Sequence, residues 1–333
     1  MATIKDVAKE AQVSIATVSR VINKSPKASQ TSIEAVTLAM KKLGYRPNAA
    51  ARALVNQSSQ AMGVLVGDVS DPFFGAMVKA IDTVATAQGK HLLIGNGFHS
   101  AQKEREAIEL LIHHRCEALV IHSKGLSNEE LIEFSKEIQG MVIINRFIPE
   151  IAERCIALDN IKGSYTATEF LIKNGHKHIG YICSNHDIED TEHRKQGYLQ
   201  ALKDYGLPYS ENYIDYGLPN EAGGEEAMTN LLTKGLPLTA IATYNDYMAA
   251  GCLSVLDENG IHAPHDISIV GYDNTIISRY LHPKLTTMHY PIQLMAEKAT
   301  LLALSLANNQ LAKAETSMYV PTLVKRLSVK TLD

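Results

Sequence analysis

The sequence contains polar and aromatic side chains that could bind a small ligand, and most of them follow short apolar runs such as MGVLVG, MVII and ISIVGY. The candidates are Asp71, Phe73, Asn145, Arg146, Arg194, Asn245 and Asp273. Carboxylates accept hydroxyl hydrogens, arginine donates through a fixed fork, and an aromatic ring can cover the apolar face of a sugar. These residue types suit a neutral polyhydroxyl ligand, and a sugar is the expected one. The alternative at any one position is a helix cap, a role that Asp246 could also fill.

The elements that must hold these side chains alternate along the chain from Met62 onward. Apolar runs such as HLLIGN, ALVIH and HIGYIC are separated by helix-like stretches, among them 163–174, 189–205, 223–234 and 246–258. Continuous apolar strands separated by helices predict parallel sheets that are covered on both faces, and ligands bind beyond the carboxyl ends of such strands. Two series of strands predict two α/β lobes. The N-lobe comprises about 61–160 plus 292–320, and the C-lobe about 161–290 plus 321–333.

The distribution of charge divides the chain into a basic and an acidic part. The 333 residues carry a net charge of −4, with 45% hydrophobic and 20% charged residues, which is ordinary for a folded protein of two or three domains. Residues 1–58 hold nine positive and three negative side chains, a net charge of +6, whereas the remainder has 23 positive and 33 negative, a net charge of −10. A small basic unit on a large acidic one predicts a head that binds a polyanion.

Three short helices are predicted within the basic head. Thr3 and Asp6 form a capping box for a helix that ends near Glu10, and Ser14 caps a second helix over IATVSRVIN. A third helix begins near Ser29 or Thr31 and ends at Gly44. A small core should form between the first two helices, from Val7, Ala8, Val18, Val21 and Ile22. The third helix carries apolar residues at helical spacing: Ile33, Val36, Met40 and Leu43. This order is the helix-turn-helix design, whose second helix enters the major groove of DNA; a helical bundle for protein contacts is the alternative.

A hinge is predicted between the head and the body. Pro47 ends the third helix, and Asn48 can cap a short helix over AAARALV before the polar linker NQSSQ. Seven residues are fewer than the about 12–15 that a helix needs for marginal stability in water. The hinge helix should therefore fold only where another element supports it.

The segments IKDVAKEAQVSIATVSRVIN and LGYRPNAAARAL resemble the head and hinge of the LacI family of bacterial repressors. The resemblance continues through VGDVSDPFFGAMVKA, GHKHIGYI and ISIVGYDN and covers essentially the whole chain. It implies a helix-turn-helix domain over 1–46, a hinge over 47–60, and a periplasmic-binding-protein-like body over 61–333 that binds the effector and dimerises. Gln12 departs from the family, which usually has Gly there; a positive φ costs a non-glycine residue about 1 kcal/mol, so the turn is expected to adjust.

The resemblance also implies roles in DNA binding. Ile15 and Ala16 begin the second helix and should contact thymine methyl groups, and Arg20 can donate to guanine O6 and N7. In the hinge, Leu54 matches the leucine that wedges between base pairs of the minor groove, with Asn48 and Arg52 beside it. Phosphate contacts are expected from Thr17, Ser19, Asn23, Ser29 and Thr31, and Thr3 and Ser14 complete the candidate set. Helix solvation is the alternative for Thr17 and Ser19, and packing of a linker residue on the body is the alternative for Leu54.

The family pattern places Arg194, Asn245 and Asp273 at positions that contact sugar. Within the family the segments are most similar to repressors of galactose use and transport, which implies release from operator DNA by D-galactose. A different sugar or a nucleoside is the alternative inducer. The resemblance further implies a homodimer, and no heptad segment follows VKRLSVKTLD to make a tetramer. A transport-type sugar-binding protein would fit the body and leave the basic head unexplained.

Other classes of protein are disfavoured. The run Gly95-Asn-Gly97 is half of a dinucleotide fingerprint, but Ser100 replaces the third glycine and Glu117 begins an apolar run instead of ending one. Neither a nucleophile elbow nor a phosphate loop occurs, so we expect no enzyme and no cofactor.

The four cysteines and the histidine pairs lack metal-ligand spacing and suggest buried thiols and no metal. No apolar run reaches the about 18 residues of a membrane span, and the start lacks an apolar signal core, so we expect a cytoplasmic protein that joins the nucleoid when bound to operator.

Overall fold

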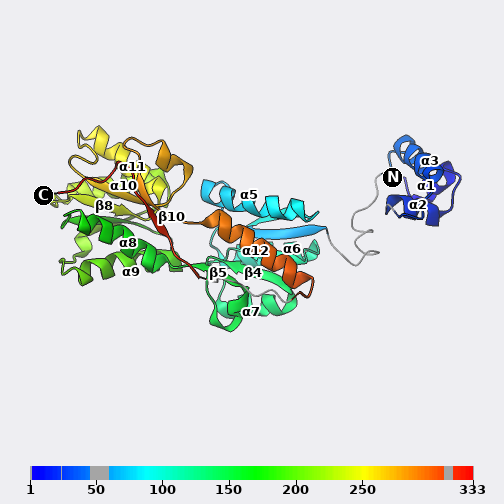
Figure 1. Cartoon of the computed structure of the whole chain (residues 1–333), viewed down its shortest axis with the longest axis horizontal. Helices are drawn as coiled ribbons and strands as arrows, with labels where there is room; N and C mark the ends of the chain where they lie inside the picture. The colour runs from blue at the N-terminus through cyan, green and yellow to red at the C-terminus, as the bar shows by residue number, and fades with distance from the viewer. Residues whose placement is uncertain (1, 24, 46–59, 311–317, 333) are drawn as a thin grey trace. The chain divides into compact units, whose positions relative to one another are not determined.

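The computed structural model describes residues 2–23, 25–45, 60–310 and 318–332. It divides into two units, Met1–Gln60 and Ala61–Asp333 (Figure 1). The candidate hinge residues Asn48, Arg52 and Leu54 lie outside the described residues.

The head contains the three helices that the sequence predicts, α1 Ile4–Glu10, α2 Ile15–Ile22 and α3 Gln30–Lys42. Their N-caps are Thr3, Ser14 and Ser29, and the capping box between Thr3 and Asp6 is present. The helices pack through a small core of Val7, Ala8, Val18, Val36 and Ala39, with Val21, Ile22, Met40 and Leu43 at its edge. The helix boundaries are therefore confirmed.

Ile33 shares the helical spacing of Val36 but is 37% exposed, because the close packing on α3 begins one turn later, at Val36. One expectation for the head was wrong. The turn between α1 and α2 does not adjust to Gln12, which has φ of 52°. The backbone of Gln12 is held by its N–H, which donates to the carbonyl of Lys9, and by the next amide, Val13 N, which donates to Ala8 O.

The body contains two sheets of six strands in its described residues (Figure 1). We call the lobes that are built on them the N-lobe and the C-lobe. In spatial order, the N-lobe sheet consists of β11 Met318–Tyr319, β5 Cys155–Leu158, β4 Gly140–Ile144, β3 Ala118–Ile121, β1 Ala61–Val66 and β2 His91–Asn96. The C-lobe sheet consists of β12 Thr322–Val324, β10 Thr286–His289, β9 Ser268–Asp273, β8 Ala240–Thr243, β6 Ile179–Ser184 and β7 Ile214–Gly217. All pairs are parallel except β10 with β12.

Helices cover both faces of each sheet, as the apolar runs predict. In the N-lobe they are α5 Pro72–Ala87, α6 Ala101–His113, α7 Asn128–Glu137 and α12 Ile292–Ala307. In the C-lobe they are α8 Asn160–Lys173, α9 Glu189–Asp204, α10 Glu221–Thr233 and α11 Asp246–Glu258. Alternate residues of one strand enter different cores: Val64 packs with α5 and α12, whereas Leu65 packs with α6 and α7. Figure 1 shows α12, in orange, beside α5 in cyan.

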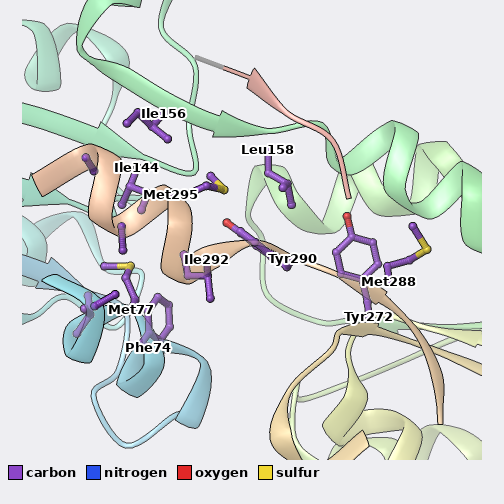
Figure 2. Close-up of a cluster of buried hydrophobic side chains, with 14 of the residues drawn as sticks. Phe74, Met77, Ile144, Ile156, Leu158, Tyr272, Met288, Tyr290, Ile292 and Met295 are labelled. Atoms are coloured by element: carbon purple, nitrogen blue, oxygen red, sulfur yellow. The ribbon is translucent and has the colours of Figure 1, made fainter. Parts of the chain in front are cut away.

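The chain passes between the lobes at three places, after β5, after β10 and between β11 and β12. One cluster of buried side chains runs through this region and joins the two lobes. Figure 2 shows Leu158 and Tyr290 between the N-lobe side chains around Met295 and the C-lobe residues Tyr272 and Met288. The carboxyl ends of both sets of parallel strands thus come close to one shared region.

Candidate functional site

A cavity of about 670 Å³ lies at the carboxyl ends of the strands, between the two lobes. That volume is within the about 300–1,000 Å³ that is typical of small-molecule sites. Its described lining includes six of the seven residues that the sequence nominates: Asp71, Phe73, Asn145, Arg194, Asn245 and Asp273. The first three come from the N-lobe and the last three from the C-lobe, so a ligand in this cavity would touch both.

Arg194 is a fixed donor of the cavity. Its guanidinium donates from Nε to Asn160 Oδ1 at 2.9 Å and from Nη1 to the carbonyl of Tyr244 at 2.6 Å. Its guanidinium carbon lies 3.8 Å from the centre of the Tyr272 ring. Because the residue is only 4% exposed, these contacts hold one orientation of the side chain before any ligand arrives.

Asp273 ends β9 and faces Arg194, with 3.4 Å between Oδ1 and Nη2. Burial raises the pKa of Asp273 to about 6, and the nearby guanidinium of Arg194 opposes that rise. The backbone at Asp273 is left-handed, with φ of 93°, and Asn145 at the end of β4 has φ of 61°. Positive φ at non-glycine residues is strained and is concentrated at functional sites.

Two of the cavity residues also cap helices, as the alternative reading allowed. Asn245 accepts a hydrogen bond from Met248 N at 2.8 Å at the start of α11, and Asp71 accepts one from Phe73 N at 2.8 Å at the start of α5. The Asn245 amide nitrogen donates to the Pro219 carbonyl. Burial raises the pKa of Asp71. A capping role and a place in the cavity are therefore combined in the same side chains.

Asp246 does not cap α11. Its carboxylate is fully buried and accepts hydrogen bonds from Thr275 N at 2.6 Å and from the Thr287 hydroxyl at 2.5 Å. Burial raises the pKa of Asp246 to about 8, and the negative charge of Asp273 adds to the rise. Asp246 thus connects the loop after Asp273 with β10. The residue that caps α11 is Asn245.

Arg146 is not among the described residues that line the cavity. Its guanidinium donates to the carbonyl of Leu126 at 2.8 Å and approaches that of Ser123 at 3.5 Å. The prediction that Arg146 faces the ligand with Asn145 does not match this orientation, because the two carbonyls draw the long side chain toward the loop after β3.

Several residues of the cavity were missed from the sequence, among them His99, His122, His186, Asp190, Tyr244 and Tyr290. Within the described chain, the buried polar atoms without a hydrogen-bond partner include His122 Nδ1, Asn145 Oδ1 and Tyr290 Oη. Buried polar atoms are nearly always paired, and all three residues line the cavity, so a bound ligand is the candidate partner for these atoms. His122 directly follows β3, and the rule that selected Asn145 at a strand end would also have selected it.

Aromatic side chains form the apolar part of the cavity wall. Phe73 lies against Tyr290 with 4.9 Å between ring centres, and Phe74 lies against His122 at the same distance. Burial lowers the pKa of His122 to about 3, and the positive charge of Lys124 contributes. His122 is therefore neutral at pH 7, which suits an uncharged ligand.

The α2 surface of the head presents the residues nominated for base contacts. Ile15 is 46% exposed, and Ala16 and Arg20 are also exposed. Several residues nominated for phosphate contacts already serve the helices: the hydroxyl of Thr3 donates to Asp6 at 2.7 Å, and those of Ser14 and Ser29 accept from the amides of Thr17 and Ser32. Ser19 accepts from the Asn23 amide at 3.4 Å, while Thr31 is exposed.

The four cysteines are buried and unpaired, as the sequence predicts. Among the described residues, no three His, Cys, Asp or Glu side chains are placed to hold a metal ion. In the same part of the chain, no helix is both long and apolar enough to cross a membrane.

A helix-turn-helix head joined to a two-lobed body with an internal cavity defines a class of ligand-responsive regulators of transcription. Residues 3–48 match the family model for bacterial regulatory proteins of the lacI family, and residues 168–329 match that for a periplasmic binding protein-like domain. The chain belongs to the lacI family and is a transcriptional regulator, not an enzyme.

Known proteins resemble the chain along its whole length. It is 55% identical over 331 residues to the HTH-type transcriptional regulator GalR of Escherichia coli K12, covering 99% of this chain and 96% of that protein. It is 52% identical to the HTH-type transcriptional regulator GalS of Salmonella typhimurium LT2, covering 99% and 97%. The crystal structure of the Lac repressor dimer bound to operator and an anti-inducer matches with a TM-score of 0.83 and 25% identity, covering 99% of both chains.

Proposed function

We propose that this regulator is a homodimeric repressor of genes for galactose use and transport, and that D-galactose is its inducer. The observation that carries the proposal is the convergence of Arg194, Asn245 and Asp273 with N-lobe residues in one cavity of suitable size. Its donors and acceptors suit hydroxyl groups and its rings suit the apolar face of a pyranose. The 55% identity to GalR favours galactose over another sugar or a nucleoside.

In this proposal the residues 1–46 bind operator DNA in the major groove. Arg20 reads a guanine, Ile15 and Ala16 contact thymine methyl groups, and the hydroxyl and amide side chains around them contact phosphates. The exposure of Ile15, Ala16 and Arg20 on α2 supports this arrangement. The protein acts in the cytoplasm, at the nucleoid.

The residues 47–60 act as the hinge, and residues 61–333 bind the sugar and dimerise. Leu54 wedges into the minor groove, with Asn48 and Arg52 beside it. Rotation of the lobes around bound sugar separates the two hinge segments of the dimer, whose short helices then lose their mutual support. Sugar releases the operator only if its affinity differs between the two arrangements of the lobes.

A gel-shift titration with a near-palindromic galactose-operon operator tests the proposal. Binding should weaken in D-galactose and remain unchanged in D-glucose, which differs only in the configuration of one hydroxyl group. Unchanged binding in D-galactose would disprove the inducer, and failure to bind the operator at all would disprove the repressor. Sedimentation of the full chain, alone and with operator, tests the dimer.

A further inference from the structure

A buried ion pair joins the two lobes beside the cavity. Lys124 lies in the N-lobe loop after β3, and Asp190 lies in the first turn of α9 in the C-lobe. Lys124 Nζ is 2.7 Å from Asp190 Oδ1, and the two side chains are 1% and 8% exposed. Lys124 Nζ also donates to the carbonyl of Asn145, whereas Glu189 lies farther away, at 3.7 Å, and is largely exposed.

Asp190 connects this pair to the residues that face the ligand. Its Oδ2 accepts from Asn145 Nδ2 at 2.8 Å, a second contact between the lobes, and its Oδ1 accepts from Asn160 Nδ2 at 3.2 Å. Asn160 in turn accepts from Arg194 Nε. The chain of contacts therefore runs from Lys124 through Asp190 to the principal donor of the cavity.

The backbone that carries Lys124 is held firmly in the N-lobe. The buried carboxylate of Glu104 accepts hydrogen bonds from the amides of Lys124, Gly125 and Leu126, at 3.0 to 3.1 Å, and from the Ser123 hydroxyl. Arg146 donates to the carbonyl at the end of the same loop. Since these bonds fix the loop, the Lys124 ammonium keeps its place relative to the rest of the N-lobe.

A buried pair of this kind favours one arrangement of the lobes. While the lobes meet, each charge is shielded from water, so removal of one partner leaves the other uncompensated. When the lobes separate, water solvates both charges and the pair contributes little. The 2.7 Å contact and the further hydrogen bonds that the two charges make to Asn145 and Asn160 offset the cost of removing the charges from water, so the pair stabilises the arrangement in which residues of both lobes line one cavity.

We propose that Lys124 is a positioning residue of the inducer site, whose ion pair with Asp190 holds the lobes in the arrangement that binds sugar. Lys124 itself is not among the described residues lining the cavity, so it acts through the lobes and not by touching the ligand. The proposal rests on the sugar-binding function proposed above.

The experiment compares Lys124→Met, Asp190→Asn and the double variant with the unaltered protein, with Lys136→Met as the matched control. Lys136 is an exposed lysine of α7 in the same lobe. Titration calorimetry with D-galactose should give a Kd at least tenfold higher for Lys124→Met and an unchanged Kd for Lys136→Met. The double variant leaves neither charge of the pair uncompensated. It should lose no more affinity than the weaker-binding single variant, because loss of the Lys124–Asp190 pair is common to both substitutions. Lys124→Arg should recover part of the affinity.

A second measurement needs no ligand. All four native cysteines are buried, so spin labels can be attached at Glu133→Cys in the N-lobe and Gln196→Cys in the C-lobe, both exposed positions. The distance between the labels, measured in labelled protein diluted with unlabelled protein, should lengthen or broaden in Lys124→Met and in the double variant. An unchanged distance distribution in both would overturn the proposal, as would an unchanged Kd. If the unaltered protein binds no galactose, the inducer proposal fails, and the label distances still decide whether the pair holds the lobes.

Discussion

Arg194 and Asp273 face each other across the C-lobe wall of the cavity, with 3.4 Å between the guanidinium nitrogen and the carboxylate oxygen. Asp273 ends β9, and Arg194 lies on α9, the helix that follows β6; their side chains are 9% and 4% exposed before a ligand is bound. Preorganised donors and acceptors of this kind lose little entropy on binding.

Arg194→Lys should raise the Kd for D-galactose by about 10- to 100-fold. Lysine keeps the positive charge and loses the planar fork, and a hydrogen bond from a charged group contributes about 1.5–3 kcal/mol. Lys195→Met is the control, because Lys195 is the next residue of α9, is not among the described residues that line the cavity, and donates instead to the Tyr216 hydroxyl of β7. Calorimetry measures both, and equal affinities in the two variants would exclude Arg194 as a ligand contact.

Two substitutions at Asn245 should separate its capping role from its ligand role. Asn245→Ala should lower stability by about 0.5–2 kcal/mol through loss of the α11 cap and should also weaken sugar binding. Asn245→Ser keeps a capping oxygen and should restore most of the thermal stability without restoring affinity. Recovery of both properties in Asn245→Ser would mean that the side chain only caps the helix.

The contribution of His122 to the stability of the body should fall as the pH is lowered from 7 to 5, whereas the raised pKa values of Asp246 and Asp273 act in the opposite direction. Its pKa is lowered to about 3 by burial, whereas an unfolded histidine has a pKa of about 6.5, so the unfolded state binds more protons between these values. The loss reaches about 2 kcal/mol at pH 5. Urea unfolding at the two pH values, followed by tyrosine fluorescence, should show that the free energy of unfolding of His122→Asn changes between pH 7 and pH 5 by about 2 kcal/mol more favourably than that of the unaltered protein. An equal change in both proteins would contradict the lowered pKa. The neighbouring Lys124, His99 and Asp190 are the same in both proteins.

Gln12→Gly should stabilise the head by about 0.5–1 kcal/mol. The residue has φ of 52°, a conformation that costs a non-glycine residue about 1 kcal/mol, and the greater freedom of glycine in the unfolded chain offsets part of the gain. Hydrogen exchange of the α1 and α2 amides measures the difference. Gln12→Ala is the control and should not stabilise the head, because alanine also has a Cβ atom that disfavours positive φ.

Arg20→Ala should cost about 1–3 kcal/mol of operator binding and relax specificity at a single base pair. Gel shifts with a set of operators, each changed at one position, measure both quantities. Lys177→Ala removes the same charge from an exposed position of the body and should leave them unchanged. A loss that is uniform across all the operators would assign Arg20 to a phosphate instead of a base.

Local signals predicted most of the helices and strands because short-range physics governs them, although neither α7 nor α12 was among the predicted helices. Thr3, Ser14 and Ser29 cap the head helices through bonds to amides three residues away. The strands that were missed, β5, β7, β10, β11 and β12, are two to four residues long, and β10 reads TTMH, with hardly any apolar character. Such strands form because a partner strand that is distant in the sequence completes their hydrogen bonds. No local sequence pattern predicts that pairing.

Strand ends predicted the position of most cavity residues but not the direction of every side chain. Asn145 and Arg146 are adjacent, yet the first lines the cavity and the second bonds to Leu126. A long side chain follows whichever acceptors the fold brings near it. The sequence suggested the residue types of the site and could not distinguish those two outcomes.

By itself, the sequence determined the class of this protein: a basic helix-turn-helix head, alternating strands and helices in the body, and polar residues at strand ends, all set by neighbours a few positions apart. Only the tertiary structure decided which residues of one lobe meet which residues of the other beside the cavity. Lys124 and Asp190 are 66 residues apart and lie in different lobes, and the Lys124 ammonium meets the Asp190 carboxylate because the described chain passes between the lobes three times. A pair of charges has no periodicity along the chain, so its existence depends on how the two lobes pack.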